Sequence, residues 1–323
     1  MRGLRIVLVT IGIVFALAAL TGFIGDRIAT AREKEKYPPK GKLVDIGGYR
    51  IHLYCVGSGS PTVLLDAGFF DSLEQWKLVQ PQVAQKTRVC SYDRAGEGWS
   101  DSSPYPQTST QIASEFHAAL VAAGEHGPYI AVGHSIAGLY ARMFVTQYRP
   151  EVAGLLLDDS VHPDECLEFP PQCAGHPLIF GMVRLASPLG LTRVLPFCHQ
   201  SGARPDCAKY VGAVLRGFDA TRTSHLQVKQ TNSYGNLPLV VLAHDPKTGL
   251  DKKRDDVREA AWTKWQVELS RLSANSSLIV VPGVGHEIQL EKPDVVIDAI
   301  DRLVEESRPK PQTGQIVSDN AYP

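Results

Sequence analysis

The segment VGHSIAG, residues 132–138, has the residue types and spacing of a turn that presents a nucleophilic serine. Gly133 stands two residues before Ser135 and Ala137 stands two residues after it, so the segment differs from the pattern G-x-S-x-G by one methyl group. The apolar run 128–132 precedes the turn and a segment of helical period follows it, which is the context the motif requires. These features predict a nucleophile at Ser135; the alternative is a serine that only caps a helix.

A serine hydroxyl is a weak nucleophile at neutral pH, so Ser135 needs a base within hydrogen-bond reach. The chain has ten histidines. His286 is the best placed, because it lies in the glycine-flanked loop PGVGHEI between the last apolar run and the last helical segment. His134 is adjacent to Ser135, but neighbouring residues in such a turn point apart, so we expect it to pack or to line a pocket. We therefore predict His286 as the base.

The elements that must position these residues follow from the alternation of apolar runs with segments of helical period. Strands are expected in KLVDIGGYRIHLYCV (two strands joined at Gly47 and Gly48), PTVLLDAG, TRVCSYD, PYIAVGH, VAGLLLDD, PLVVLAH and SLIVVPG. Helices are expected in LEQWKLVQPQVAQK, TQIASEFHAALVAAG, AGLYARMFVTQY, DVREAAWTKWQVELSRL and PDVVIDAIDRLVEE. Strands covered on both faces by helices form a mostly parallel sheet, so the sequence predicts an α/β fold with right-handed crossovers.

Further regions are predicted around a core made of residues 41–160 and 236–308. Residues 161–235 interrupt the strand–helix alternation and contain four of the six cysteines, so we expect a lid there. Residues 309–323 have almost no apolar side chains and are expected to be disordered. At the other end, an apolar segment, residues 1–25, and a linker, residues 26–40, precede the core.

The apolar segment near the N-terminus has the length of a membrane anchor. Arg2 and Arg5 precede an uncharged stretch, residues 6–25. About 20 such residues can cross a bilayer as a helix, whereas the apolar part of a secretion signal usually has about 7–15. We therefore expect an anchor whose basic front end is cytoplasmic, with the rest of the chain extracytoplasmic. The alternative is a signal peptide cleaved after Ala18 or Ala31, which gives a secreted protein.

Outside the cytosol disulfides persist, and an even number of cysteines permits full pairing. Four cysteines lie in loop-like segments of the expected lid: Cys166, Cys173, Cys198 and Cys207. Local bridges within each segment and crossed bridges between them are both compatible with the sequence. Cys55 and Cys90 lie in strand-like runs, where a free buried thiol is the commoner state, so we expect them to be unpaired.

The composition points to a small-molecule substrate. Lys and Arg number 33 and Asp and Glu number 34, and no long run of one sign occurs, so the chain has no basic field that would recruit nucleic acid. The sequence contains no convincing set of metal ligands and no dinucleotide fingerprint. We therefore expect no metal, no cofactor and no nucleic-acid partner.

Four motifs resemble those of the α/β-hydrolase superfamily, in the order in which that family has them. VGHSIAG resembles its nucleophile elbow, VLLDAGFFDS its oxyanion loop, SYDRAGEGWSD its Asp-Arg-Gly-rich turn, and VPGVGHEIQLEKPDVVIDAI its histidine loop and closing helix. The resemblance covers most of the chain after residue 40 and implies the α/β-hydrolase fold, with the lid after the strand that follows the elbow. Ala137 and Ala67 depart from the family's glycine and histidine, but neither departure removes a reacting atom.

The resemblance also implies a carboxylate that orients His286 and stabilises its charged form. The family places this acid after one of two strands, which leaves Asp159, at the end of GLLLDD, and Asp245, in VLAHDP. The turn around Asp245 matches the family's usual Gly-x-x-Asp poorly, so we favour Asp159 and keep Asp245 as the alternative.

An oxyanion hole is expected from the backbone amides of Phe69 and Ile136, with Gly68 permitting close backbone approach. Asp93 and Arg94 are expected to brace the loop below the site without a catalytic role.

Together these residues predict a serine hydrolase that cleaves a carboxylic ester or thioester through an acyl-enzyme. An anchor and a lid both suit a lipophilic ester. One alternative is an aminopeptidase-like amide hydrolase in which Asp164 and Glu165 hold the substrate amine, and another is a hydrolase-fold binding protein without turnover. Epoxide hydrolase and dehalogenase chemistry is disfavoured because those relatives have aspartate at the elbow.

Overall fold

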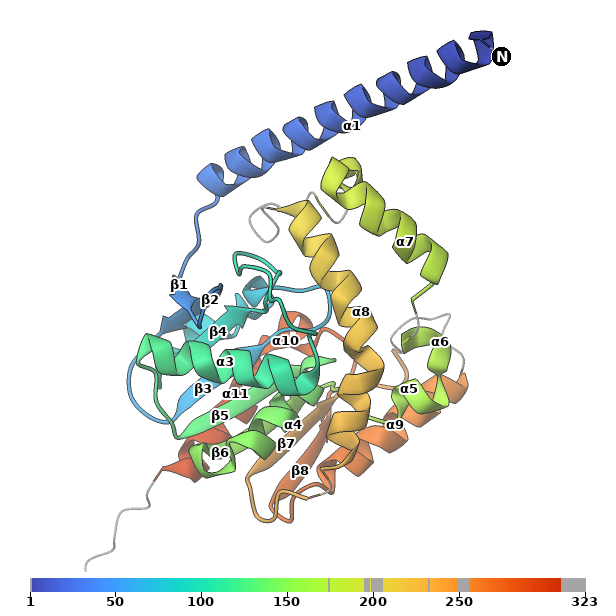
Figure 1. Ribbon diagram of the computed structural model, residues 1–323. Coiled ribbons are helices and arrows are strands. Elements are labelled where there is room, and N and C mark those ends of the chain that lie inside the picture. The colour runs from blue at the N-terminus through green and yellow to red at the C-terminus, as the bar shows by residue number, and fades with distance from the viewer. Residues whose placement is uncertain are drawn as a thin grey trace, which may run out of the picture.

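The computed structural model describes residues 2–173, 175–194, 198, 206–231, 233–248 and 256–308. Its centre is an eight-stranded sheet with the strand order β1-β2-β4-β3-β5-β6-β7-β8 (Figure 1). The strands are β1 (Lys42–Asp45), β2 (Arg50–Val56), β3 (Thr62–Asp66), β4 (Val89–Asp93), β5 (Tyr129–His134), β6 (Val152–Asp158), β7 (Leu239–Ala243) and β8 (Ser276–Val280). Strands β3 to β8 are parallel, and β1 and β2 form an antiparallel extension beside β4. This is the predicted α/β fold with a mostly parallel sheet.

Helices cover both faces of the sheet and enclose a separate apolar core on each. One core receives side chains from α3 (Ser109–Ala123), α4 (Ala137–Gln147) and α9 (Asp256–Ser270). The other receives them from the loop and short helix α2 (Gln80–Val83), from α10 (Ile288–Glu291) and from α11 (Pro293–Ser307). Successive strand residues enter opposite cores, as Leu155 and Leu156 do, which explains why the strands read as continuous apolar runs.

The segment 73–86, predicted as one helix, is divided in two. A 3₁₀ helix, η1 (Leu73–Trp76), ends before α2 begins at Gln80. Pro81 explains the division, since it has no amide hydrogen to continue a preceding helix but fits the first turn of a new one.

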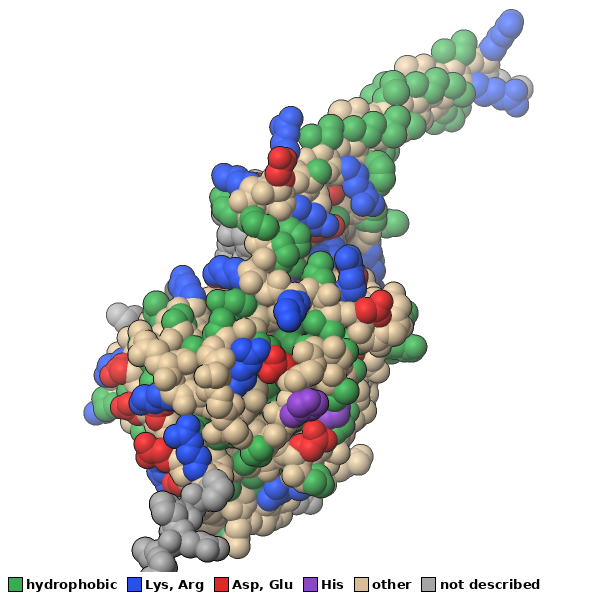
Figure 2. Space-filling model, turned by 90° about the vertical axis from the view of Figure 1, so that its left-hand side faces the viewer, with side chains coloured by type: hydrophobic (Ala, Val, Ile, Leu, Met, Phe, Trp, Pro, Cys, Tyr) green, Lys and Arg blue, Asp and Glu red, His purple; other side chains and the backbone are tan. Residues whose placement is uncertain are grey.

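The N-terminal helix α1 (Arg2–Lys36) projects from the body of the molecule (Figure 1). Among the described helices it is the one with the length and apolar composition to cross a membrane, a property that a signal sequence shares. Apolar side chains cover its projecting part, with basic side chains at the tip (Figure 2). The helix also includes residues 26–36, which the sequence suggested as part of a linker. Those residues contain no glycine or proline, so nothing in them ends the helix.

The insertion between β6 and β7 is helical where the structure describes it. It contains α5 (Glu165–Glu168), α6 (Pro170–Cys173), α7 (Pro177–Ala186), the 3₁₀ helices η3 (Ser187–Leu189) and η4 (Leu191–Val194), and α8 (Cys207–Lys229). Helix α8 crosses the carboxyl ends of the strands, and α7 lies on the side of α8 that faces away from the sheet (Figure 1). We refer to residues 161–235 as the lid. The predicted disordered tail, residues 309–323, lies outside the described residues.

The prediction that Cys55 and Cys90 are unpaired is wrong, because the two residues form a disulfide. Strand β2 pairs antiparallel with β4, and in that register Cys55 lies directly opposite Cys90, with both side chains on one face. Which strands are neighbours is a property of the sheet that the two local sequences do not show. In the lid the local pairing occurs, with the bridges Cys166–Cys173 and Cys198–Cys207.

Candidate active site

Ser135 lies in the turn between β5 and α4, with a positive φ of 55° that non-glycine residues seldom adopt. Hydrogen bonds fix this turn: the Ser135 amide donates to the Asp158 carbonyl at 3.0 Å, and the Ser135 carbonyl accepts from the Val161 amide at 3.0 Å. Glycine is required two residues before the serine, since a Cβ at Gly133 would collide with the Ala137 carbonyl. The turn therefore presents the serine hydroxyl away from the sheet.

The departure from G-x-S-x-G at residue 137 also has a structural explanation. Ala137 is buried at the start of α4. The next position is the crowded one, because a Cβ at Gly138 would collide with the side chain of Ser160. In this chain the second glycine is thus needed one residue later than the motif places it.

The structure brings Ser135, His286 and Asp159 together in series. The Nε2 atom of His286 lies 2.9 Å from the Ser135 Oγ, and its Nδ1 lies 2.6 Å from Asp159 Oδ2. The other candidate acid lies elsewhere: the Asp245 carboxylate accepts from the backbone amides of Lys247 at 2.9 Å and Gly283 at 3.0 Å. Asp245 therefore braces the turn after β7, and Asp159 is the carboxylate that contacts His286.

Asp159 is completely buried at the end of β6 and also has a positive φ, 42°. Besides His286, its carboxylate accepts hydrogen bonds from the Trp262 indole at 3.0 Å and from the amide and ring of His244. Burial by itself raises the pKa of a carboxyl group, but the bonds from His244 and His286 outweigh burial and hold the pKa of Asp159 well below its ordinary value. The group is an ionised carboxylate in the interior of the protein.

His244 is a part of the site that the sequence did not predict. Its Nδ1 lies 2.8 Å from Asp159 Oδ2, and its Nε2 lies 2.7 Å from Glu259 Oε1 on α9. A neutral imidazole has one donor nitrogen and one acceptor nitrogen, so two ionised carboxylates are satisfied together only by the imidazolium. Burial opposes this charge, but the hydrogen bonds that the ring donates to Asp159 and Glu259 raise the pKa of His244. The available signal was its position at the end of β7, on the sheet edge that also carries Asp159.

His134 supports the loop that carries His286. Its ring is buried, and Nε2 lies 3.0 Å from the backbone carbonyl oxygen of His286. Burial, and then the neighbouring His286, lower the pKa of His134 to about 3, so the ring is neutral and Nε2–H donates to that carbonyl. The expectation that His134 packs rather than reacts agrees with this arrangement.

The two residues expected to supply the oxyanion-hole amides line the same cavity as Ser135. Phe69 and Ile136 line it, and among the described residues neither amide donates a hydrogen bond within the protein. The loop is drawn close at Gly68, where a Cβ would lie 2.8 Å from His134 Nδ1. Arg94 holds the loop from below by donating to the Gly68 carbonyl at 2.6 Å and to the Asp66 carboxylate at 2.7 Å.

The cavity above Ser135 has a volume of about 280 Å³, and both the core and the lid line it. Its aromatic wall includes Phe69 and Phe218, whose ring centroids are 5.0 Å apart. Of the acidic pair considered for binding an amine, Glu165 lines the cavity, whereas Asp164 pairs with Lys229 at 2.7 Å. The walls suit an apolar group beside the serine.

In the described part of the chain, three clusters of His, Cys or Glu side chains are compact enough to consider as metal ligands. Two of them contain the disulfide-bonded pairs Cys55–Cys90 and Cys166–Cys173, whose sulfurs are not thiolates. In the third, both ring nitrogens of His286 already contact Ser135 and Asp159. None of the three offers a free set of ligands.

Comparison with known proteins gives a family match over most of the chain. The sequence profile of the alpha/beta hydrolase family matches residues 63–299. The chain is 27% identical over 275 residues to an uncharacterized protein of Schizosaccharomyces pombe, covering 75% of this chain and 51% of that protein. It is 26% identical over 262 residues to the uncharacterized protein YqjL of Bacillus subtilis, covering 80% and 90%. The chain thus spans about half the length of the first relative and most of the second.

Solved structures give the same fold. A putative lipase from Acinetobacter baumannii has a TM-score of 0.62 at 20% identity, covering 87% of this chain and 96% of that one. A thermophilic esterase from Thermogutta terrifontis has a TM-score of 0.58 at 19% identity, covering 83% and 98%. The epoxide hydrolase CorEH has a TM-score of 0.58 at 22% identity, covering 83% and 98%. At these identities the likeness concerns the fold alone.

The charge on His244 leads to a prediction about stability. Glu259→Gln removes the charge that faces Nε2 and keeps a hydrogen-bond acceptor. A raised histidine pKa contributes stability that is fully present below the unfolded value of about 6.5 and is lost as the pH rises through the folded value. We therefore expect the variant's deficit in free energy of unfolding to be largest near about pH 6 and to shrink as the pH rises.

Denaturant unfolding of the full chain in detergent at several pH values measures this deficit. Glu305→Gln, at an exposed position on α11, is the matched control and should show no such dependence. A deficit that stays constant or grows with pH would contradict an imidazolium at His244.

Proposed function

The chain belongs to the alpha/beta hydrolase family, and we propose that within this family it is a serine hydrolase that cleaves carboxylic esters or thioesters through an acyl-enzyme. The observation that carries the proposal is the hydrogen-bonded series from Ser135 Oγ through His286 to the buried Asp159. Such a series supplies a nucleophile, a general base and a group that orients the base. A binding protein without turnover has no need of it.

In the proposed mechanism His286 Nε2 accepts the proton of Ser135 as its Oγ attacks the acyl carbon. Asp159 keeps the Nδ1 proton facing itself and stabilises the imidazolium that forms. The amides of Phe69 and Ile136 donate to the oxyanion, a contribution worth about 10²–10³ in rate for each donor. His286 then protonates the leaving alcohol or thiol, which leaves an acyl group on Ser135. In the second half, His286 accepts a proton from water as the water attacks the acyl carbon, and it returns the proton to Ser135 Oγ as the acid is released.

Three features favour esters over the alternatives. Aromatic side chains form much of the cavity wall, which suits an acyl chain. The amide-hydrolase alternative relies on an acidic pair, of which Asp164 is engaged with Lys229. The fold is shared with an epoxide hydrolase, but the elbow of this chain presents a serine hydroxyl in place of the aspartate of such relatives.

We also propose that α1 is a retained membrane anchor, with the catalytic domain extracytoplasmic. Residues 6–25 supply the apolar length, and Arg2 and Arg5 mark the cytoplasmic end. The disulfides suit an oxidising compartment. A lipophilic ester presented at the membrane is the substrate that this location favours.

Ser135→Ala should abolish labelling by a fluorophosphonate probe and turnover of p-nitrophenyl esters, because it removes the attacking atom. Loss of such a group costs on the order of 10⁴-fold or more in turnover. Ser114→Ala on α3 is the matched control and should keep both properties. Retention of more than about a hundredth of the wild-type turnover by Ser135→Ala would rule out this serine as the nucleophile.

Asp159→Asn and Asp245→Asn compare the two candidate acids by the same substitution, which replaces a carboxylate with an amide of nearly the same shape. The first leaves an amide beside His286 that favours the wrong tautomer, so we expect kcat to fall by about 10³–10⁴-fold. The second weakens only a turn, and we expect kcat to stay within about threefold. Thermal unfolding establishes that both variants are folded, and the reverse order of effects would transfer the role to Asp245.

The anchor proposal predicts that the full chain remains in membranes after alkaline carbonate extraction and that protease added outside digests its C-terminal domain. N-terminal sequencing of the mature protein decides between anchor and signal peptide. A mature chain beginning after Ala18 or Ala31 would show that α1 is removed.

A further inference from the structure

Helix α7 of the lid has an apolar face that the protein leaves uncovered. Leu178, Met182 and Leu185 follow one another at helical spacing, and 74%, 63% and 77% of their surfaces are exposed. Among the described residues outside α1, no large apolar side chains are more exposed than Leu178 and Leu185. The opposite face is occupied, since Phe180 and Val183 pack against the apolar cluster of α8. Helix α7 therefore has apolar side chains on both faces, one packed against α8 and the other exposed.

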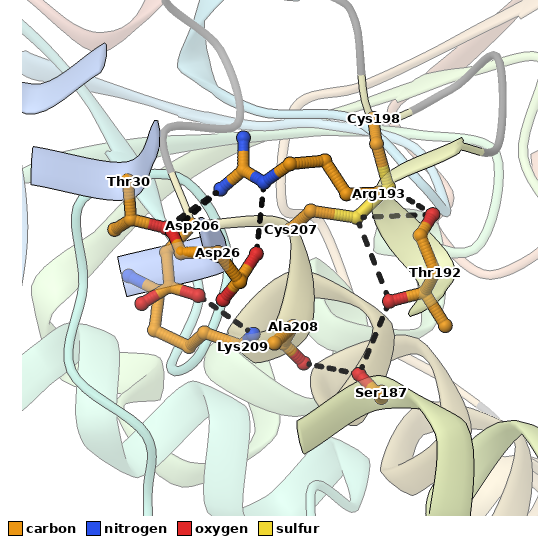
Figure 3. The surroundings of a disulfide bond; sticks show 10 residues. All are labelled: Asp26, Thr30, Ser187, Thr192, Arg193, Cys198, Asp206, Cys207, Ala208 and Lys209. Atoms are coloured by element: carbon orange, nitrogen blue, oxygen red, sulfur yellow. Dashed lines mark hydrogen bonds and ion pairs between the residues drawn. A yellow bond between two sulfur atoms is a disulfide. The ribbon is translucent and has the colours of Figure 1, made fainter. Parts of the chain in front are cut away.

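The end of α7 is fixed against α1 at the point where the apolar stretch of α1 ends. Backbone of η3 meets α1 so closely that a Cβ at Gly22 would collide with the Leu189 carbonyl. Four residues later on α1, Asp26 Oδ1 accepts a hydrogen bond from Arg193 Nε at 2.8 Å, and Arg193 also donates to Thr30 at 2.7 Å (Figure 3). These contacts join the lid to the last turn of the proposed membrane span, at Gly22, and to the helix just beyond it, at Asp26 and Thr30.

Helix α7 is also connected to the cavity above Ser135. The ring centroids of Phe180 and Phe218 are 5.2 Å apart, and those of Phe218 and Phe69 are 5.0 Å apart. Phe218 and Phe69 line the cavity, so apolar side chains are continuous from α7 to the serine. One face of this short helix thus contacts aromatic side chains of the cavity wall, while the other face is exposed.

We propose that the apolar face of α7, formed by Leu178, Met182 and Leu185, lies in the bilayer interface beside α1, so that the cavity receives its ester from the bilayer. The occupant is lipid because η3, which directly follows α7, contacts α1 at Gly22, within the stretch proposed to span the membrane. A helix in the interface buries the apolar side chains of one face among acyl chains, and the opposite face of α7 is already covered, since Phe180 and Val183 pack against α8. This inference rests on the proposed anchor and names the substrate class of the proposed function as an ester of a membrane lipid.

The position of α7 is tested on the full chain in phosphatidylcholine vesicles, with an environment-sensitive nitrobenzoxadiazole label on an introduced cysteine. Met182→Cys is the test position, and Val121→Cys on α3, which is 53% exposed, is the matched control. We expect the label at 182 to emit at shorter wavelength and to be quenched by doxyl-labelled lipid, and the label at 121 to do neither. Flotation of the protein with the vesicles is measured on the same samples.

Three outcomes would overturn the inference. Equal emission from the two positions would place α7 in water. Shorter-wavelength emission without quenching by doxyl lipid, together with cross-linking between chains, would assign the face to a second copy of the protein. Failure to float with vesicles would remove the anchor on which the inference rests. None of these readouts requires turnover, so the inference can be judged even if the chain hydrolyses no ester.

The consequence for substrate delivery is tested with Leu178→Glu/Met182→Glu/Leu185→Glu, with Val121→Glu as control. We expect turnover of a long-chain ester embedded in vesicles to fall by at least about tenfold, and turnover of a short soluble ester to stay within about twofold. An equal loss on both substrates would show that α7 supports the lid and does not deliver lipid. If the wild type turns over neither ester, the proposed function fails while the labelling result still stands.

Discussion

The candidate site depends on one buried negative charge. Asp159 has no exposed surface, and an uncompensated carboxylate in such a place costs several kcal/mol. Its donors come from the end of β7, from α9 and from the loop after β8, in His244, Trp262 and His286. The parallel sheet makes this convergence possible, because the carboxyl ends of neighbouring strands β6, β7 and β8 lie at the same edge. The order of those strands is therefore a condition for the site.

Glu259 balances the positive charge that His244 brings beside Asp159. An imidazolium at His244 alone would neutralise Asp159 and leave nothing to stabilise a positive charge on His286. Glu259, 2.7 Å from His244, adds a second carboxylate, so that the three groups together keep one net negative charge beside His286. Asp159 then stays fixed by donors on two sides and remains electrostatically useful to the proposed base. Helix α9 supplies both Glu259 and Trp262 one turn apart, which ties this arrangement to a single helical face.

Much of the fold could be predicted from the sequence, because local patterns determine it: apolar runs indicate the strands, and Gly133 with Ser135 indicates the turn between β5 and α4. What could not be predicted depends on contacts between distant segments. The Cys55–Cys90 bridge follows from the pairing of β2 with β4, which neither strand's sequence reveals. The contact of His244 with Glu259 likewise joins a strand end to a helix across a stretch with no motif. Motifs thus predict residues that a known pattern marks, including the distant set Ser135, Asp159 and His286, and they miss partners such as Glu259 that no motif marks.

The contacts between α1 and the lid bear on how the proposed enzyme would face a membrane. Residues 26–36 continue the helix for about 16 Å beyond the apolar stretch, so in the proposed orientation they extend the helix outside the bilayer. Arg193, a residue of the lid, donates hydrogen bonds to the start of this extension, at Asp26 and Thr30. The Cys198–Cys207 bridge then links that segment to the start of α8, the helix that crosses the cavity (Figure 3). In the proposed orientation, α1 therefore determines the height and direction of the lid above the membrane more directly than those of the sheet. The position of the cavity depends in turn on the lid that lines it.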